Sequence, residues 1–241
     1  MRMEAPPETA ARAVAKPAIA DVLREGIRQG MLEPGQPLIQ ASIAEAMGVS
    51  RIPVREALHA LASEGLVTFG DDGGARVTAL APEEVDELWT LRALLESHMA
   101  EPIARNATPV DVERLRALVA SMEDADHATW SERNFAFHQD LHALSGMPHF
   151  ADVAGRVLTM IEPYSRVAVS VLDAQGEAQA EHRGMVDAIA AGDGIALAQL
   201  LLHHSNRARQ ALLAYSAARQ HETDQRVVAT EAARSLADHL R

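Results

Sequence analysis

Apolar residues recur at helical spacing along most of this chain. In the first quarter of the sequence they form three short stripes, which are separated by turns containing glycine and proline. Glycine readily adopts the positive φ of a tight turn and proline disfavours helix continuation, so these positions mark element boundaries. The pattern predicts one helix over residues 17–30, a second over 41–47 and a third that begins after Ser50.

The predicted helix after Ser50 carries its own start signal. Ser50 is a favourable N-cap residue, and we expect its hydroxyl to accept a free backbone N–H of the first turn. Pro53 falls in that turn, where a missing N–H costs little because the donor has no partner within the helix. Arg51 and Arg55 are four residues apart and share one face near the N-terminus. A helix-turn-helix protein presents its base and phosphate contacts there, so the sequence predicts a DNA-recognition helix.

An alternating pattern follows this helix. Residues 66–69 and 75–78 are typical of two short strands, and they are joined by a loop rich in glycine and aspartate that ends at Gly74. A helix, a helix-turn-helix and a two-stranded wing in this order predict a winged helix-turn-helix domain over residues 17–80. Residues 1–16 are expected to form a flexible N-terminal segment.

From Pro82 onward the pattern is helical throughout. Six helices are predicted, over about 82–105, 109–126, 129–145, 148–170, 176–192 and 194–218. The short breaks between them favour an antiparallel bundle over residues 81–220. The predicted fold class is therefore mostly α, with a winged helix-turn-helix domain followed by an all-α bundle of about six helices. Residues 221–241 are expected to form a loose tail or one more helix.

Composition limits where the protein works. The chain has no cysteine, which excludes a disulfide framework and thiolate chemistry. Its apolar runs are much shorter than the roughly 20 residues that span a bilayer, and the N-terminus lacks the apolar core of a signal peptide. We therefore expect a cytoplasmic protein with no membrane partner.

The net charge of −12 is unfavourable for binding DNA. A DNA-binding surface must therefore be local, built from arginines such as Arg28, Arg51 and Arg55 and from helix N-termini. Asp71 and Asp72 in the wing loop would repel a phosphate backbone. We expect salt-sensitive binding by each monomer and a dependence on dimerisation for useful affinity.

Three of the eleven histidines lie on apolar stripes that should face the bundle interior: His138, His182 and His204. Asn134 precedes His138 by four residues and shares its face. Three imidazoles and an amide oxygen suit a divalent transition metal such as zinc, nickel or manganese. The alternative is that each is a hydrogen-bonded core histidine. His142 could form an exposed pair with His138, although its polar neighbours favour a solvated side chain.

Motifs in both halves resemble a known family. Those of the first half are Gly-x-Leu-x-Pro-Gly at 30–35, Val-Ser-Arg-x-Pro-Val-Arg-Glu-Ala-Leu at 49–58 and Glu-Gly-Leu-Val at 64–67. They resemble the GntR family of bacterial transcription regulators. Phe-His-x-x-Leu at 137–141, Glu-His-Arg at 181–183 and the helix of His204 resemble the effector domain of its FadR branch. The resemblance implies a homodimeric, ligand-responsive regulator, most often a repressor, that binds double-stranded operator DNA.

The resemblance also implies roles for individual residues. The DNA-binding set comprises Arg28, Ser50, Arg51, Pro53, Arg55 and Gly74. The metal ligands are Asn134, which stands where aspartate is frequent, with His138, His182 and His204. Arg92 would bind a small carboxylate effector through two parallel hydrogen bonds, and the alternative is an ordinary Arg92–Glu96 ion pair on the helix surface. Tyr164 and Arg166 are further candidates for the effector pocket.

Two other functions are consistent with parts of this pattern. Three histidines with an open coordination position also describe the zinc site of a hydrolase. Glu181 is the nearest candidate for its general base, but its stripe is polar and predicted to face outward, and an enzyme leaves the helix-turn-helix unexplained. The second alternative is a metal-free sensor of acyl thioesters.

Overall fold

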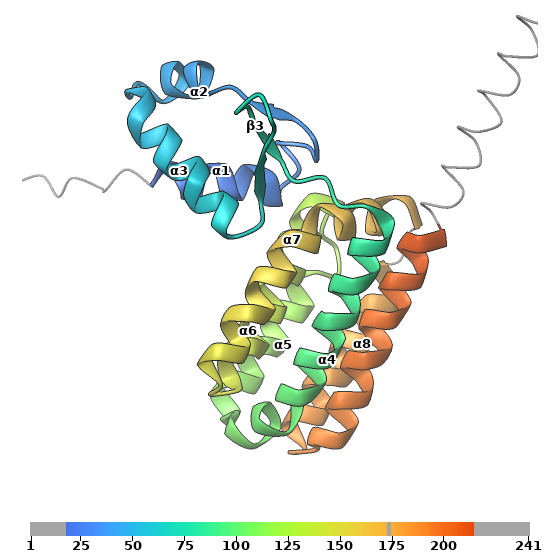
Figure 1. Ribbon diagram of the computed structural model, residues 1–241. Coiled ribbons are helices and arrows are strands. Elements are labelled where there is room, and N and C mark those ends of the chain that lie inside the picture. Colours follow the sequence, from blue (N-terminus) through green and yellow to red (C-terminus); the bar gives the residue numbers. More distant parts are fainter. Residues whose placement is uncertain (1–17, 173–174, 215–241) are drawn as a thin grey trace, which may run out of the picture.

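The computed structural model describes residues 18–172 and 175–214, which form two domains (Figure 1). The first consists of α1 (Ile19–Arg28), β1 (Pro37–Leu38), α2 (Gln40–Met47), α3 (Arg51–Ser63), β2 (Val67–Phe69) and β3 (Ala75–Val77). The second consists of α4 (Pro82–Asn106), α5 (Pro109–Ser121), α6 (His127–Leu144), α7 (Pro148–Leu172), α8 (Gln175–Ala190) and a helix over residues 194–214. The predicted mostly-α class is confirmed.

The wing differs from the prediction because its sheet has three strands rather than two. The strand order is β1-β3-β2, and both pairings are antiparallel. The added strand β1 is held where Gly35 N–H donates to Val77 O and Val77 N–H donates to Gln36 O, both at 2.9 Å. Only two residues long and beginning with Pro37, β1 shows no alternation that the sequence pattern could reveal.

Glycine fixes the turn between the two helices of the helix-turn-helix. Gly48 ends α2 at φ 65°, in the left-handed region, and α3 then begins at Arg51. Ser50 is the N-cap of α3 and has the extended backbone of a cap, but its side chain makes no capping hydrogen bond. The prediction of a hydroxyl cap is therefore wrong, and no side chain caps the first-turn N–H groups.

The first domain is held together by a small apolar core between α1, α3 and the wing. Leu23, Ile27, Val54, Leu58 and Leu61 are all buried in it. Full burial of such a side chain contributes about 1.5–3 kcal/mol, so these few residues provide much of the domain's stability. The helical stripes that predicted α1 and α3 are the faces that form this core.

The second domain is a helical bundle with its own core. Met99, Leu115, Phe137, Met185 and Leu201 contribute to this core from five different helices. The helix expected over 109–126 ends at residue 121, because Asp126 caps α6 by accepting the Thr129 N–H at 2.8 Å. No helix among the described residues combines the length and hydropathy needed to cross a bilayer. The predictions for residues 1–16 and 221–241 lie outside the described residues.

The first domain sits on one end of the bundle, mainly over α7 (Figure 1). Met160 of α7 packs against the core of the first domain. The Tyr164 hydroxyl accepts the Leu80 N–H at 2.7 Å, just before α4 begins. The Arg28 guanidinium lies over the Phe135 ring at 4.8 Å. The two domains are therefore in direct contact through α1, α6 and α7.

We expect Gly48→Ala to destabilise the protein by about 1–2 kcal/mol, because an L side chain strains the left-handed backbone there. No atom lies within 4 Å of an added Cβ, so the cost comes from the backbone alone. The matched control is Gly155→Ala within α7, which also has open space around its Cβ. It should stabilise by about 0.5–1 kcal/mol through helix propensity. Urea unfolding of the two variants should show opposite signs; equal signs would contradict this explanation.

Candidate functional site

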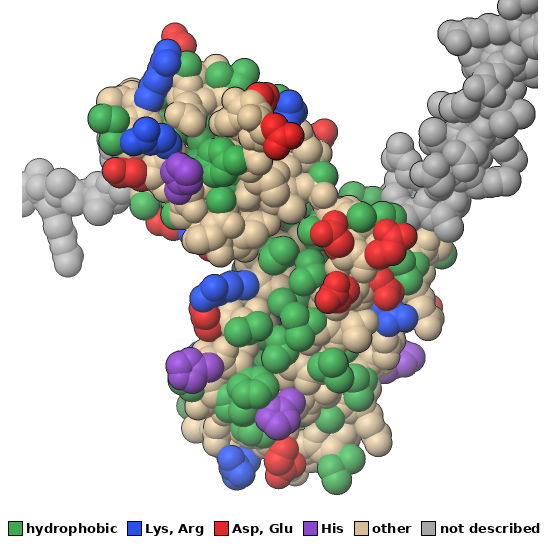
Figure 2. All heavy atoms as spheres, in the orientation of Figure 1, with side chains coloured by type: hydrophobic (Ala, Val, Ile, Leu, Met, Phe, Trp, Pro, Cys, Tyr) green, Lys and Arg blue, Asp and Glu red, His purple; other side chains and the backbone are tan. Residues whose placement is uncertain are grey.

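The start of α3 lies at the outer end of the first domain, away from the bundle, and Figure 2 shows basic side chains gathered there (Figures 1 and 2). Ser50, Arg51 and Arg55 are exposed, and Pro53 is half-buried. Neither arginine has an ion-pair partner among residues 18–172 and 175–214. The structure therefore places three of the predicted DNA-binding residues on one open, basic end of a helix.

The wing loop is exposed, and its acidic residues are not equivalent. Gly74 donates its N–H to the Asp72 carboxylate at 2.9 Å, and Gly73 has φ 73°. Asp72 therefore shapes the loop as well as adding negative charge to it. Gly74 remains a predicted DNA contact.

Arg28 does not belong to the DNA-binding face. Its side chain is buried at the domain contact, where its Nε donates to Glu25 at 2.8 Å and its guanidinium lies over Phe135. Arg24 is also engaged, by both oxygens of Glu64. The prediction for Arg28 is wrong because this side of α1 packs against the bundle, which its helical spacing could not show.

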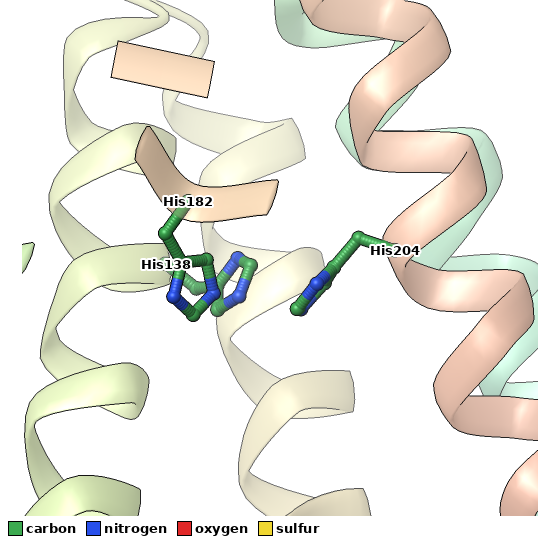
Figure 3. A group of neighbouring side chains, drawn as sticks. All are labelled: His138, His182 and His204. Atoms are coloured by element: carbon green, nitrogen blue, oxygen red, sulfur yellow. The ribbon is translucent and has the colours of Figure 1, made fainter. Parts of the chain in front are cut away.

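The main candidate site lies inside the bundle, where three histidines from three helices meet (Figure 3). His138 is on α6, His182 is on α8 and His204 is on the helix over 194–214. All three are buried, and one ligand atom from each lies within 4.8 Å of the others. Their helical spacing predicted that each would face the interior, and the structure brings them to one point.

Several polar atoms at this point have no hydrogen-bond partner. They are Nε2 of His138, both ring nitrogens of His182, and Oδ1 of Asn134. An unpaired buried polar group costs about 1–3 kcal/mol, and native structures rarely leave so many together. Three imidazoles and one amide oxygen are a suitable donor set for a tetrahedral divalent ion. The residues present therefore fit a metal of the predicted kind.

The surroundings keep these histidines neutral. Burial, together with the nearby Arg92 charge, lowers the pKa of His138 to about 3. Burial likewise lowers the pKa of His182 and of His204. Neutral imidazole is the form that binds a metal, so the protein supplies ligands that need not lose a proton first.

Two carboxylates lie behind the histidines. Glu96 Oε1 is 3.3 Å from His138 Nδ1, and Glu181 Oε2 is 2.6 Å from His204 Nδ1. Burial opposes ionisation of both, but Arg92 and His138 hold the pKa of Glu96 well below its usual range. Hydrogen bonds from His204 and Arg207 lower the pKa of Glu181 to about 2. Carboxylates in these positions orient metal-binding rings and raise their basicity.

Two sequence predictions about the residues around the three histidines are wrong. Glu181 faces inward because the helix over 194–214 covers it, and Arg207 donates to both of its oxygens at 2.6 and 2.9 Å. Its oxygens are thus occupied, which leaves no free general base there. His142 is buried rather than solvated, and its Nε2 lies 3.0 Å from Glu96 Oε1. His203, the neighbour of His204, is 68% exposed.

Arg92 forms the predicted ion pair with Glu96, but not at the predicted place. Its Nε donates to Glu96 at 3.0 Å, but the pair is buried rather than on the surface, with side chains 1% and 2% exposed. Its Nη2 has no partner, and neither has the nearby Trp89 Nε1. Both residues line a cavity of about 40 Å³, together with Trp130, Asn134, His204 and Arg207. One water needs roughly 10–15 Å³, so the cavity accommodates a small polar group.

Tyr164 and Arg166 are not among the residues that line this cavity. Tyr164 holds the segment before α4 through Leu80, and Arg166 lies against Gly30 at the end of α1. Both predictions are therefore corrected to roles at the domain contact. Trp89 and Arg207 were missed, because only the packing of neighbouring helices shows that they share a cavity.

Comparison with known proteins agrees with this architecture. The model of the FCD domain matches residues 87–207, and that of bacterial regulatory proteins of the gntR family matches residues 16–77. The chain belongs to the GntR family. This GntR regulator is 30% identical to the HTH-type transcriptional regulator LutR of Bacillus subtilis (strain 168) over 213 residues, which cover 78% of the chain and 97% of LutR.

A second relative, from Paenarthrobacter nicotinovorans, carries the name "Probable D-xylose utilization operon transcriptional repressor". It is 28% identical over 207 residues, covering 84% of this chain and 90% of the relative. The solved structure of E. coli McbR/YncC matches with a TM-score of 0.73 at 22% identity, covering 82% and 96% of the two chains. That likeness shows the shared fold. The GntR protein described here is therefore a transcriptional regulator.

We expect Asn134→Asp to bind Zn²⁺ about tenfold more tightly than the wild type, which corresponds to ~1.4 kcal/mol. A carboxylate adds a negative charge and a stronger ligand beside the three imidazoles. The matched control is Asn206→Asp, which adds the same charge at an exposed position two residues after His204. Competition with a chromophoric chelator measures both affinities. Equal affinities in the two variants would exclude Asn134 from the ligand set.

Proposed function

We propose that this regulator is a repressor that binds a near-palindromic operator as a homodimer and responds to a small carboxylate in the histidine cavity. The observation that most supports the proposal is the composition of this one cavity. Two of the four proposed metal ligands, Asn134 with its unpaired Oδ1 and His204, line it, and so does Arg92 with its unpaired Nη2. A carboxylate bound between them would be held by charge-assisted hydrogen bonds.

The exposed end of α3 supports the DNA-binding part of the proposal. Arg51 and Arg55 would contact bases or phosphates in the major groove, and the unpaired first-turn N–H groups behind Ser50 would hold a phosphate. Two copies of this helix, one in each subunit, would contact successive major grooves of the operator.

An exposed apolar face of the bundle supports the homodimer. Figure 2 shows a band of apolar side chains down this face of the bundle. Leu94 of α4 is 60% exposed and Val153 of α7 is 43% exposed. They flank the stacked rings of His98 and Phe150, which join the two helices. Apolar patches of this kind mark protein–protein contacts.

The donor set supports zinc, nickel or manganese as the cofactor. The ligands would be Asn134, His138, His182 and His204, with Glu96 and Glu181 orienting two of the rings. A bound ion would offer a coordination position to one oxygen of the effector. Trp89 Nε1 and Arg92 would donate to the rest of the carboxylate.

The same cavity argues against the two alternatives. Its volume of about 40 Å³ is small for an acyl thioester. For a hydrolase, Glu181 is the nearest candidate base, but its oxygens already accept hydrogen bonds from His204 and Arg207. A small organic acid is the effector that these dimensions and donors favour.

The DNA-binding proposal predicts a large effect of Arg51→Ala combined with Arg55→Ala. Each arginine contact is worth about 1–3 kcal/mol, so loss of two contacts should lower operator affinity by at least roughly 30-fold. An operator selected from a random-sequence library with the wild-type protein provides the DNA. Arg105→Ala with Arg156→Ala removes two exposed arginines of the helical domain and should leave affinity unchanged. Equal loss in both double variants would refute the assignment of the DNA-binding face.

The effector proposal predicts that Arg92→Lys weakens carboxylate binding by roughly 10–100-fold. It keeps the charge but loses the planar fork, and hydrogen bonds to charged groups contribute about 1.5–3 kcal/mol. Both tryptophans of the chain line the cavity, so their fluorescence reports its occupancy. A panel of small carboxylates is titrated with Zn²⁺ and again with EDTA. Unchanged affinity in Arg92→Lys, against an Arg105→Lys control, would remove Arg92 from the site.

A further inference from the structure

One helix, α7, contacts both the cavity and the first domain. Ser165 and Val169 line the cavity. Met160 packs into the core of the first domain, and Tyr164 accepts a hydrogen bond from Leu80 at the start of the bundle. Any change in the cavity therefore acts on an element that the first domain also contacts.

Between Met160 and Tyr164, α7 carries a carboxyl group that belongs neither to the DNA-binding face nor to the lining of the cavity. Glu162 is 1% exposed, and neither of its oxygens has a hydrogen-bond partner. The charged groups that face it are Arg28 and Glu25 of α1, Arg92 of α4, and Arg166 of α7 itself. It is thus within reach of the charges of an arginine of the first domain and of the arginine of the cavity.

The two arginines whose charges reach Glu162 from the first domain and from the cavity are also incompletely paired. Nη1 of Arg28 and Nη2 of Arg92 are buried without a hydrogen-bond partner. No ion pair joins Glu162 to either residue in the part of the chain that the structure describes. The carboxyl is therefore held in the field of both arginines without being fixed to either one.

Burial raises the pKa of Glu162 to about 8, and the charge of Arg28 is the strongest of those that oppose this rise. Arg166 and Arg92 also oppose it, whereas Glu25 adds to it. A buried carboxyl of this kind is sensitive to any charge that is added nearby.

We propose that Glu162 couples the histidine cavity to the position of the DNA-binding domain. The proposal rests on the proposed function, because it supplies the route by which an effector at Arg92 alters the domain contact at Arg28. A carboxylate at Arg92 cancels a positive charge that helps Glu162 to ionise within the contact. The domain contact then weakens in the pH range in which Glu162 ionises, and a cation in the cavity strengthens it.

The pH dependence has a definite sign. The pKa of Glu162 is about 8 while the domains are in contact, and exposure of its carboxyl to water on separation would return the pKa toward the ordinary carboxyl range. The domain contact is therefore strongest at a pH below the ordinary carboxyl pKa range, and it weakens as the pH rises toward about 8. One proton changes the equilibrium by at most about tenfold per pH unit. Above about pH 8 the contact weakens no further.

The absence of cysteine makes the domain contact directly measurable. Thr68→Cys in the wing and Ala143→Cys on α6 place spin labels at exposed positions of the two domains. Pulsed electron spin resonance gives the distribution of distances between them at pH 6 to 9, without DNA or effector. We expect the fraction at the short, docked distance to fall with rising pH in the wild type and to stay constant in Glu162→Gln.

Three further variants test the specificity of this response. Glu132→Gln removes an exposed carboxylate of α6 whose charge also reaches Arg28, and it should behave as the wild type. Glu162→Asp keeps an ionisable group and should keep the pH response. Arg92→Met removes the positive charge in the cavity, so the docked fraction should continue to fall to higher pH than in the wild type. Circular dichroism confirms that each variant is folded.

A distance distribution that does not change with pH in the wild type overturns the proposal. The proposal is also overturned if the docked fraction of Glu162→Gln falls with pH as that of the wild type does. It is likewise overturned if the docked fraction of Arg92→Met stops falling at the same pH as in the wild type. Because no operator or effector is present, these results leave the proposed function standing if it passes its own tests. Added Zn²⁺ tests the same effect in the protein with the wild-type cavity. With Zn²⁺ the docked fraction should stop falling at a lower pH than in the metal-free protein.

Discussion

The structure of the helical domain depends on keeping three imidazoles neutral, close together and out of water. His138 and His182 leave ring nitrogens unpaired in the centre of the bundle beside His204, which is costly in the absence of a ligand. Glu96 and Glu181 limit this cost by holding two of the rings, and arginines in turn hold both carboxylates. The cavity is therefore a polar centre built for a ligand within an otherwise apolar core.

The polar centre is connected to the rest of the regulator through buried charges as well as through the packing of α7 against the first domain. Arg92 forms part of the cavity wall and also pairs with Glu96, so its unpaired nitrogen is held in a fixed direction. On the other side of α7, Arg28 lies over Phe135 and is shielded from solvent. Electrostatic interactions are stronger where water is excluded, so the charge of Arg92 in the cavity wall also affects Glu162 of α7.

The sequence predicted what depends on periodicity within one element. The helices, the winged helix-turn-helix and the inward face of each histidine all follow from spacing along a single helix. It failed where a partner lies on another element: Glu181 is covered by the last described helix, His142 reaches Glu96, and Arg28 is covered by the bundle. Strand β1 was missed because two residues carry no periodicity.

These failures share a physical cause that bears on how the regulator works. A polar residue on a helix surface looks solvated in the sequence until another element covers it. Arg28, Glu181 and Tyr164 are covered in this way, and each lies at the cavity or at the domain contact. A buried polar group needs a hydrogen-bond or charge partner, so each of these residues requires a defined partner on the element that covers it. The residues hardest to assign from the sequence are thus those that join the sensing and DNA-binding parts of the molecule.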